Sequence, residues 1–268
     1  MAEGRYEERY CAFIDILGFS ELIKRLGAGE TPFLFLKELL SKIHNPPKPR
    51  GGALTYAISD FQVQSISDAV AISTTPNSYG LLQIIESLTE LTRALLLEGY
   101  FIRGAIVKGK LYHDNKMVFG EALVKAYNLE QNVVRYPRIM VASDVVTQAA
   151  SDDDIGELVD ELLKPSDDGP YYVNTLRDLA TYLRRRESGN IKGKEVDDAF
   201  AMWAAIQEKI EERFSEATDV PRHFQNVQWF ANYWNETVDP IGGKIIMHIN
   251  GPGLKWYLPP AVNNRISN

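Results

Sequence analysis

The sequence has little of what marks several large classes of protein. A single cysteine, Cys11, leaves no partner for an intrachain disulfide and favours a reducing compartment. Apolar runs are too short to cross a membrane, and residues 1–10 are too charged for a signal peptide. Long basic runs are lacking, and 36 acidic against 29 basic residues give a formal net charge of −7. We therefore expect a cytoplasmic protein without a stable nucleic-acid or membrane partner.

The rest of the composition is ordinary for a globular protein, with 45% hydrophobic and 24% charged residues. Hydrophobic periodicity predicts the order strand, helix, helix, strand, strand, helix, strand over the first part of the chain. This order predicts the α+β class, with a ferredoxin-like, antiparallel-containing sheet covered by helices. After residue 150 helices predominate, with further strands expected at 170–174 and 245–249. We therefore place one domain at residues 8–175. A mainly helical extension at 176–268 would pack on that domain or on a dimer partner.

An acid interrupts the first predicted strand, which spans about residues 10–17. Buried strands rarely hold a lone carboxylate such as Asp15 unless something offsets its charge. The strand ends before Gly18, and Ser20 is placed to cap the helix that follows. A carboxylate can hold a cation and a helix N-terminus can hold an anion. This arrangement therefore suits a metal-bound phosphate chain.

A second acid, Asp68, lies at a predicted tight turn between two short strands. Two acids at adjacent strand ends, Asp15 and Asp68, could chelate one or two divalent cations. For either acid alone, an ordinary role is more common: a solvated turn residue for Asp68, or a capping group for Asp15.

These stretches, in this order, resemble the catalytic domain of class III nucleotidyl cyclases, the adenylyl and guanylyl cyclase superfamily. Residues 13–20 resemble the first metal motif and residues 65–69 the second, although family members often have glycine where Ser67 stands. The resemblance continues through residues 103–109, 119–123, 126–130 and 138–143. It covers about half of the chain.

The resemblance implies a reaction in which the ribose 3′-hydroxyl attacks the α-phosphate, giving a 3′,5′-cyclic monophosphate and pyrophosphate. It implies two divalent cations per site, Mn²⁺ or Mg²⁺, held by Asp15, Asp68 and the carbonyl of Ile16. The phosphate chain would be bound by the backbone of Leu17, Gly18, Phe19 and Ser20. Cations that would offset the developing charge are Arg103, Lys108 and Lys125. Family sites form head to tail between two subunits, so we expect a homodimer with composite active sites.

Two departures from the family pattern bear on the substrate. Val124 and Asn128 stand where the family has the Asn and Arg that steady the transition state. Gln64 and Met117 stand at the positions that specify a purine. This combination most resembles the pyrimidine cyclases of Pycsar antiphage systems, whose cyclic UMP or cyclic CMP activates a separate effector with a cyclic-nucleotide-binding domain. The predicted base-binding set is Tyr56, Arg103, Gln64 and Met117. Tyr56 could equally be a half-buried strand residue.

The first functional hypothesis is a uridylate cyclase that converts UTP to cyclic UMP in antiviral defence. A cytidylate cyclase, and an adenylyl or guanylyl cyclase, are enzymatic alternatives. A non-enzymatic alternative is an inactive cyclase-like module that binds nucleotide. Retention of both acids argues against this last alternative.

Overall fold

The computed structural model describes residues 5–44, 60–190, 193–241, 247–249 and 251. The chain forms two compact units, Met1–Arg177 and Asp178–Asn268, and each is considered by itself.

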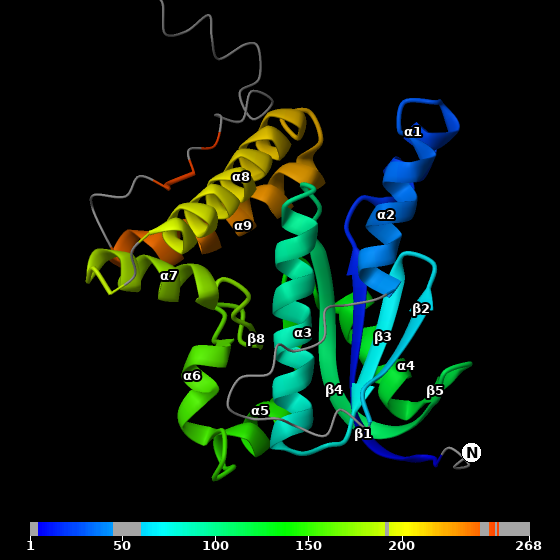
Figure 1. Cartoon of the computed structure of the whole chain (residues 1–268). Helices are drawn as coiled ribbons and strands as arrows, with labels where there is room; N and C mark the ends of the chain where they lie inside the picture. The colour runs from blue at the N-terminus through cyan, green and yellow to red at the C-terminus, as the bar shows by residue number, and fades with distance from the viewer. Residues whose placement is uncertain (1–4, 45–59, 191–192, 242–246, 250, 252–268) are drawn as a thin grey trace, which may run out of the picture. The chain divides into compact units, whose positions relative to one another are not determined.

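In the described part of the first unit, eight strands form one mixed sheet in the order β2-β3-β1-β4-β6-β8-β7, with β5 paired to β4 (Figure 1). The strands are β1 (Glu7–Ile16), β2 (Gln62–Ile66), β3 (Ala69–Thr74), β4 (Ile102–His113), β5 (Val118–Gly120), β6 (Ile139–Val141), β7 (Leu163–Lys164) and β8 (Tyr171–Val173). Only the β4–β6 pair is parallel among these pairings. The α+β class with an antiparallel-containing sheet is therefore confirmed.

Helices cover both faces of this sheet, with α3 in front and α4 behind in Figure 1. The helices are α1 (Phe19–Gly27), α2 (Phe33–His44), α3 (Ser78–Leu96), α4 (Glu121–Asn132), α5 (Ser143–Ala150) and α6 (Val159–Leu162), with a 3₁₀ turn at Gly156–Leu158. Successive strand residues point to opposite faces. Ile14 and Ile16 of β1 accordingly join the core under α3, whereas Cys11 and Phe13 join a smaller core with Ala122 of α4. Asp15, an odd-numbered residue, therefore belongs to the α4 face.

The start of α1 differs from the prediction. Gly18, not Ser20, is the N-cap residue, and the helix begins at Phe19. The amide of Leu17 still bonds to the carbonyl of Phe101 at 2.9 Å, so the chain must turn abruptly after it. Gly18 makes that turn at φ 84°, a left-handed conformation that favours glycine. Ser20 consequently lies within the first helical turn, with no capping role.

The second unit contains the rest of α7 (Arg177–Glu187), α8 (Lys194–Glu216), α9 (Pro221–Val238) and a 3₁₀ turn at Asp239–Ile241. Helices α8 and α9 pack through aromatic pairs, among them Trp203 with Trp234 at 6.2 Å between ring centroids. None of the helices in the described ranges is both long and apolar enough to span a bilayer.

The strand predicted at residues 245–249 is wrong for its described part, Met247–Ile249, which has no strand structure; residues 245–246 lie outside the described residues. Side chains of α9 satisfy the backbone of this segment in place of a neighbouring strand. Trp234 Nε1 donates to the carbonyl of Met247 at 2.6 Å. The side-chain amide of Asn235 bonds both the carbonyl and the amide of Ile249, at 3.0 and 2.8 Å.

Ser67 provides a test of the turn between β2 and β3. It has φ 60°, although left-handed backbone costs a non-glycine residue about 1–2 kcal/mol. We expect Ser67→Gly to raise the free energy of unfolding by about 0.5–1 kcal/mol, after the extra entropy of glycine in the unfolded chain is deducted. Urea denaturation measures the change. Ser65→Gly, in the extended part of β2, is the control and should lower stability. A loss of stability in Ser67→Gly would contradict the strain assigned to this turn.

Candidate active site

Strand register brings the two predicted acids to the same end of the sheet. Asp15 pairs with Ala69 of β3 on one side and with Arg103 of β4 on the other. Asp68 immediately precedes Ala69 in the turn from β2. Residues directly opposite one another in an antiparallel pair share a face, so Asp15 and Arg103 both lie on the α4 face. Asp68 is near enough that its charge acts on Asp15.

A third carboxylate reaches this cluster from α4. Glu130 is fully buried and forms an ion pair with Nε of Arg103. The guanidinium of Arg103 also lies near Asp15, with 3.6 Å between Nη2 and Oδ2. The side chains of Arg103 and Asp15 are only 12% and 18% exposed. Arg103 thus stands between two acids, with the closer contact made to Glu130.

The charges in this cluster do not balance. Among the described residues, the carboxylates of Asp15 and Glu130 pair with the guanidinium of Arg103, and the charge of Asp68 acts on both of these acids. Burial raises the pKa of Asp15 to about 7, and the charges of Glu130 and Asp68 add to this effect while Arg103 opposes it. Burial also raises the pKa of Glu130, again opposed by Arg103. Negative charge in excess, held in a poorly solvated place, is the condition under which a further cation is favoured.

The donor set fits a hard divalent cation that is completed by a substrate. Carboxylate oxygens are ligands that Mg²⁺ and Mn²⁺ prefer, and Mg²⁺ is commonly bound by one or two carboxylates together with substrate phosphates. Within the described ranges, no group of three or more His, Cys, Asp or Glu side chains has the arrangement of a metal site. Asp15 and Asp68 would therefore supply two ligands, and phosphate oxygens, water or the Ile16 carbonyl would supply the others.

The start of α1 closely follows Asp15 in the chain. The first amides of a helix lack intrahelical acceptors and carry a partial positive charge, which favours a phosphate. The amide of Leu17 donates to Phe101, so this role falls to Gly18, Phe19 and Ser20 within the predicted set.

Two of the predicted cations lie away from the cluster. Lys125 is about half exposed on α4, and its Nζ pairs with Glu121 at 2.6 Å. Lys108 lies on the opposite face of β4, because it is an odd number of residues from Arg103. There its Nζ donates to Gln148 of α5 at 3.1 Å.

The predicted base-binding residues are dispersed. Gln64 pairs with Ala71 and so shares the α4 face with Asp15, while its side-chain amide donates to the carbonyl of Ser65 at 3.3 Å. Met117 lies beyond β4 in the turn to β5 and is 50% exposed. Tyr56 lies outside the described residues.

Glu130 was not singled out from the sequence, although a signal for it exists. Ala122, Ala126 and Glu130 follow one another at four-residue intervals and are all buried. Such spacing places them on one face of a helix. An acid in line with two buried alanines therefore indicates a buried charge in need of a partner.

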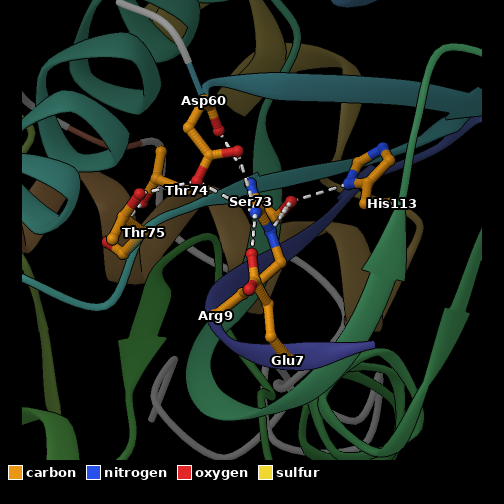
Figure 2. A network of polar contacts seen from close by, with 7 residues as sticks. All are labelled: Glu7, Arg9, Asp60, Ser73, Thr74, Thr75 and His113. Atoms are coloured by element: carbon orange, nitrogen blue, oxygen red, sulfur yellow. Dashed lines mark hydrogen bonds and ion pairs between the residues drawn. The ribbon is translucent and has the colours of Figure 1, made fainter. Parts of the chain in front are cut away.

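A second polar network lies on the same face of the sheet, farther from Asp15, and Figure 2 shows it. Arg9 is buried, and its guanidinium donates to both the side chain and the carbonyl of Asp60, at 2.9 and 2.7 Å. Its Nε donates to Ser73 at 3.0 Å, and the Ser73 hydroxyl lies 2.8 Å from Nδ1 of His113. Burial lowers the pKa of His113 to about 4, so it is neutral near pH 7. This network pairs its buried cation with an acid.

In the metal-free protein, the negative charge of Asp15 should lower the free energy of unfolding. The folded state holds a proton to about pH 7, whereas the unfolded state releases it near the ordinary value of 3.8. Folding stability due to Asp15 is therefore lost as pH rises from about 4 to 7. We expect Asp15→Asn to be more stable than the natural protein at pH 8 by roughly 1–3 kcal/mol, after allowance for partial solvent exposure. The two proteins should become equally stable below about pH 4.

Chemical denaturation across this pH range, with a chelator present, measures the difference. Asp168→Asn is the control of opposite sign, because hydrogen bonds from Arg138 lower the pKa of Asp168 to about 2. Asp168→Asn should therefore lower the free energy of unfolding at neutral pH. Parallel pH profiles for Asp15→Asn and the natural protein would contradict the raised pKa.

Comparisons with known proteins give likenesses only among solved structures. No family model and no curated protein matches the chain. A bacterial light-regulated adenylyl cyclase is 16% identical, with a TM-score of 0.37 over 63% of this chain and 90% of that one. An adenylate/guanylate cyclase/hydrolase from Silicibacter pomeroyi is 18% identical, with a TM-score of 0.38 over 62% and 95%. The catalytic core of a rhodopsin-guanylyl cyclase with converted specificity, in complex with ATPαS, is 14% identical, with a TM-score of 0.39 over 64% and 98%. The chain is thus distantly similar to structures of adenylyl and guanylyl cyclases.

Proposed function

We propose that this protein is a nucleotidyl cyclase that forms a 3′,5′-cyclic nucleotide and pyrophosphate from a nucleoside triphosphate. The observation that carries the proposal is the meeting of Asp15, Asp68 and Arg103 at one end of the sheet, directly before the start of α1. The motifs that resemble class III cyclases supply these same residues. Two acids, a guanidinium and a helix N-terminus together match the charges of a metal-bound triphosphate.

Each group has a distinct part in this reaction. A divalent cation, when bound, lowers the pKa of the ribose 3′-hydroxyl and offsets phosphate charge. Asp15 and Asp68 hold that cation, with the carbonyl of Ile16 as a further ligand. The amides at the start of α1 orient the phosphate chain. The guanidinium of Arg103 lies beside Asp15, where it would stabilise negative charge that develops on the α-phosphate and the leaving group.

The proposed substrate is UTP, with CTP as the second choice. Gln64 and Met117 are uncharged at the positions where the related cyclases read a purine. Tyr56 would fill the space that a pyrimidine leaves and donate one hydrogen bond, which suits the carbonyl oxygens of uracil better than the amine of cytosine. One buried hydrogen-bond mismatch costs about 1–3 kcal/mol, which gives roughly tenfold to hundredfold selectivity. Cyclic UMP would then act as a second messenger on an effector with a cyclic-nucleotide-binding domain, in defence against phage.

A competition assay tests activity and substrate together. The protein receives equal ATP, GTP, CTP and UTP with Mn²⁺, and mass spectrometry identifies the cyclic product. We expect mainly cyclic UMP, with at least about a hundredfold loss in Asp15→Asn and Asp68→Asn because the cation loses a ligand. Asp153→Asn, an exposed acid in the loop after α5, is the matched control and should remain active.

The products separate the alternatives. A dominant cyclic purine would end the pyrimidine assignment, and cyclic CMP would reverse the choice of base. Nucleotide binding without any cyclic product would favour an inactive binding module.

The proposed homodimer has its own test. Lys125 and Asn128 lie on the exposed part of α4, where a second subunit could use them. If sites form head to tail, a heterodimer of Asp15→Asn and Lys125→Ala keeps one intact site. Two-tag purification of this heterodimer should recover about half of the natural activity per dimer, since two equivalent sites are expected. A heterodimer of Asp15→Asn and Asp68→Asn should stay inactive, because each of its sites lacks an acid. Failure of the first pair to recover activity would refute composite sites.

A further inference from the structure

Arg103 is shared unequally between two acids. Its Nε makes a close ion pair with the fully buried carboxylate of Glu130. Its Nη2 lies 3.6 Å from the partly exposed carboxylate of Asp15, which is beyond hydrogen-bond distance. The guanidinium is therefore held mainly by α4 and only loosely by β1. Glu130 is itself oriented, since Gln131 Nε2 donates to its other oxygen at 2.6 Å.

Stability alone does not account for a charge at position 130. The residues in line with it, Ala122 and Ala126, are fully buried and apolar, and an apolar side chain would continue that surface. Replacing a buried ion pair by packed apolar residues is often neutral or stabilising. The pair of Arg138 with Asp168 differs, because Asp168 is 47% exposed and remains solvated. A completely buried Glu130 beside the candidate site therefore calls for a functional explanation.

The position of Arg103 controls how freely Asp15 can bind a cation. A guanidinium that made a close pair with Asp15 would compete directly with a metal ion for the same oxygens. A guanidinium held back by a second acid leaves those oxygens accessible and still points its outer nitrogens toward the site. Glu130 pairs with Nε of Arg103, whereas Asp15 lies near Nη2, so Glu130 supplies that second acid at a different nitrogen.

We infer that Glu130 is a positioning residue, which holds Arg103 against α4 so that Asp15 can bind a divalent cation. This inference rests on the proposed cyclase function and deepens it. Glu130 does not itself touch the cation or the substrate. Its effect passes through Arg103, so removing Arg103 should cancel the effect of removing Glu130 on metal binding.

The experiment measures Mn²⁺ binding by the full-length protein without nucleotide, by electron paramagnetic resonance of free Mn²⁺. We expect Glu130→Gln to weaken binding about tenfold, because Arg103 then pairs with Asp15. The double variant Glu130→Gln/Arg103→Met should bind Mn²⁺ as the natural protein does, yet stay inactive because it lacks the arginine. Extra Mn²⁺ should restore much of the activity of Glu130→Gln but none of the activity of the double variant.

Further variants guard against a purely structural effect. Asp168→Asn removes the acid from the ion pair with Arg138 and should lower stability without changing Mn²⁺ affinity. If Glu130→Gln does not fold, Glu130→Asp serves instead, with a smaller loss of affinity that Arg103→Met again reverses. The double variant removes the charges of Glu130 and Arg103 together, so neither of these two groups is left buried without its partner.

The outcomes distinguish this inference from the proposed function. Natural protein that cyclises nucleotide and binds Mn²⁺, together with unchanged Mn²⁺ affinity in Glu130→Gln, would overturn only the role of Glu130. A double variant that binds Mn²⁺ no better than Glu130→Gln would overturn it as well. Natural protein that neither binds Mn²⁺ nor forms a cyclic product would overturn the proposed function, and this inference with it.

Discussion

The unbalanced charge on the α4 face of the sheet is the constraint on which the candidate site depends. One guanidinium, that of Arg103, faces the carboxylates of Asp15, Glu130 and Asp68. Burial limits the screening of Asp15 and Glu130 by water, and the pKa of Asp15 rises to about 7 as a result. Holding acids in this way lowers the stability of the fold. What the acids bind must therefore explain why they are kept.

The backbone keeps these groups together through long-range pairing. Strand β1 lies between β3 and β4, and its register sets Asp15 opposite both Ala69 and Arg103. The residue after Arg103 must be glycine, since a Cβ at Gly104 would lie 2.5 Å from the carbonyl oxygen of Phe13. The strands therefore approach closely just where the charges meet. Since the other face of β1 is packed under α3, the cluster cannot relax by shifting the strand without exposing apolar residues such as Ile14.

The structural features that could be predicted from the sequence are those that depend on the local residue pattern. Alternation and turn residues placed Asp15 and Asp68 at adjacent strand ends. Alternation along β4 also predicts that Lys108 lies on the opposite face of the sheet from Arg103. The cap at Gly18 depends on how the chain leaves the sheet, which local preference for serine does not reveal. The segment Met247–Ile249 is held by side chains of α9, the helix that precedes it in the chain, so its apolar residues gave a misleading strand signal. The burial of Glu130 could be interpreted only with its partner on another element, Arg103 of β4.

The two polar networks on this face differ in how far water reaches their acids. In the network around Arg9, the largely solvated carboxylates of Asp60 and Glu7 pair with the one buried cation, and His113 stays neutral because burial lowers its pKa to about 4. Hydrogen bonds of Arg9 and Ser73 hold this network together, although Nε2 of His113 is buried without a hydrogen-bond partner. Around Asp15, the described residues leave negative charge on poorly solvated carboxylates unmatched, and this favours a cation from solution. That incompleteness is what a site for a metal-bound phosphate requires and what a purely structural network avoids.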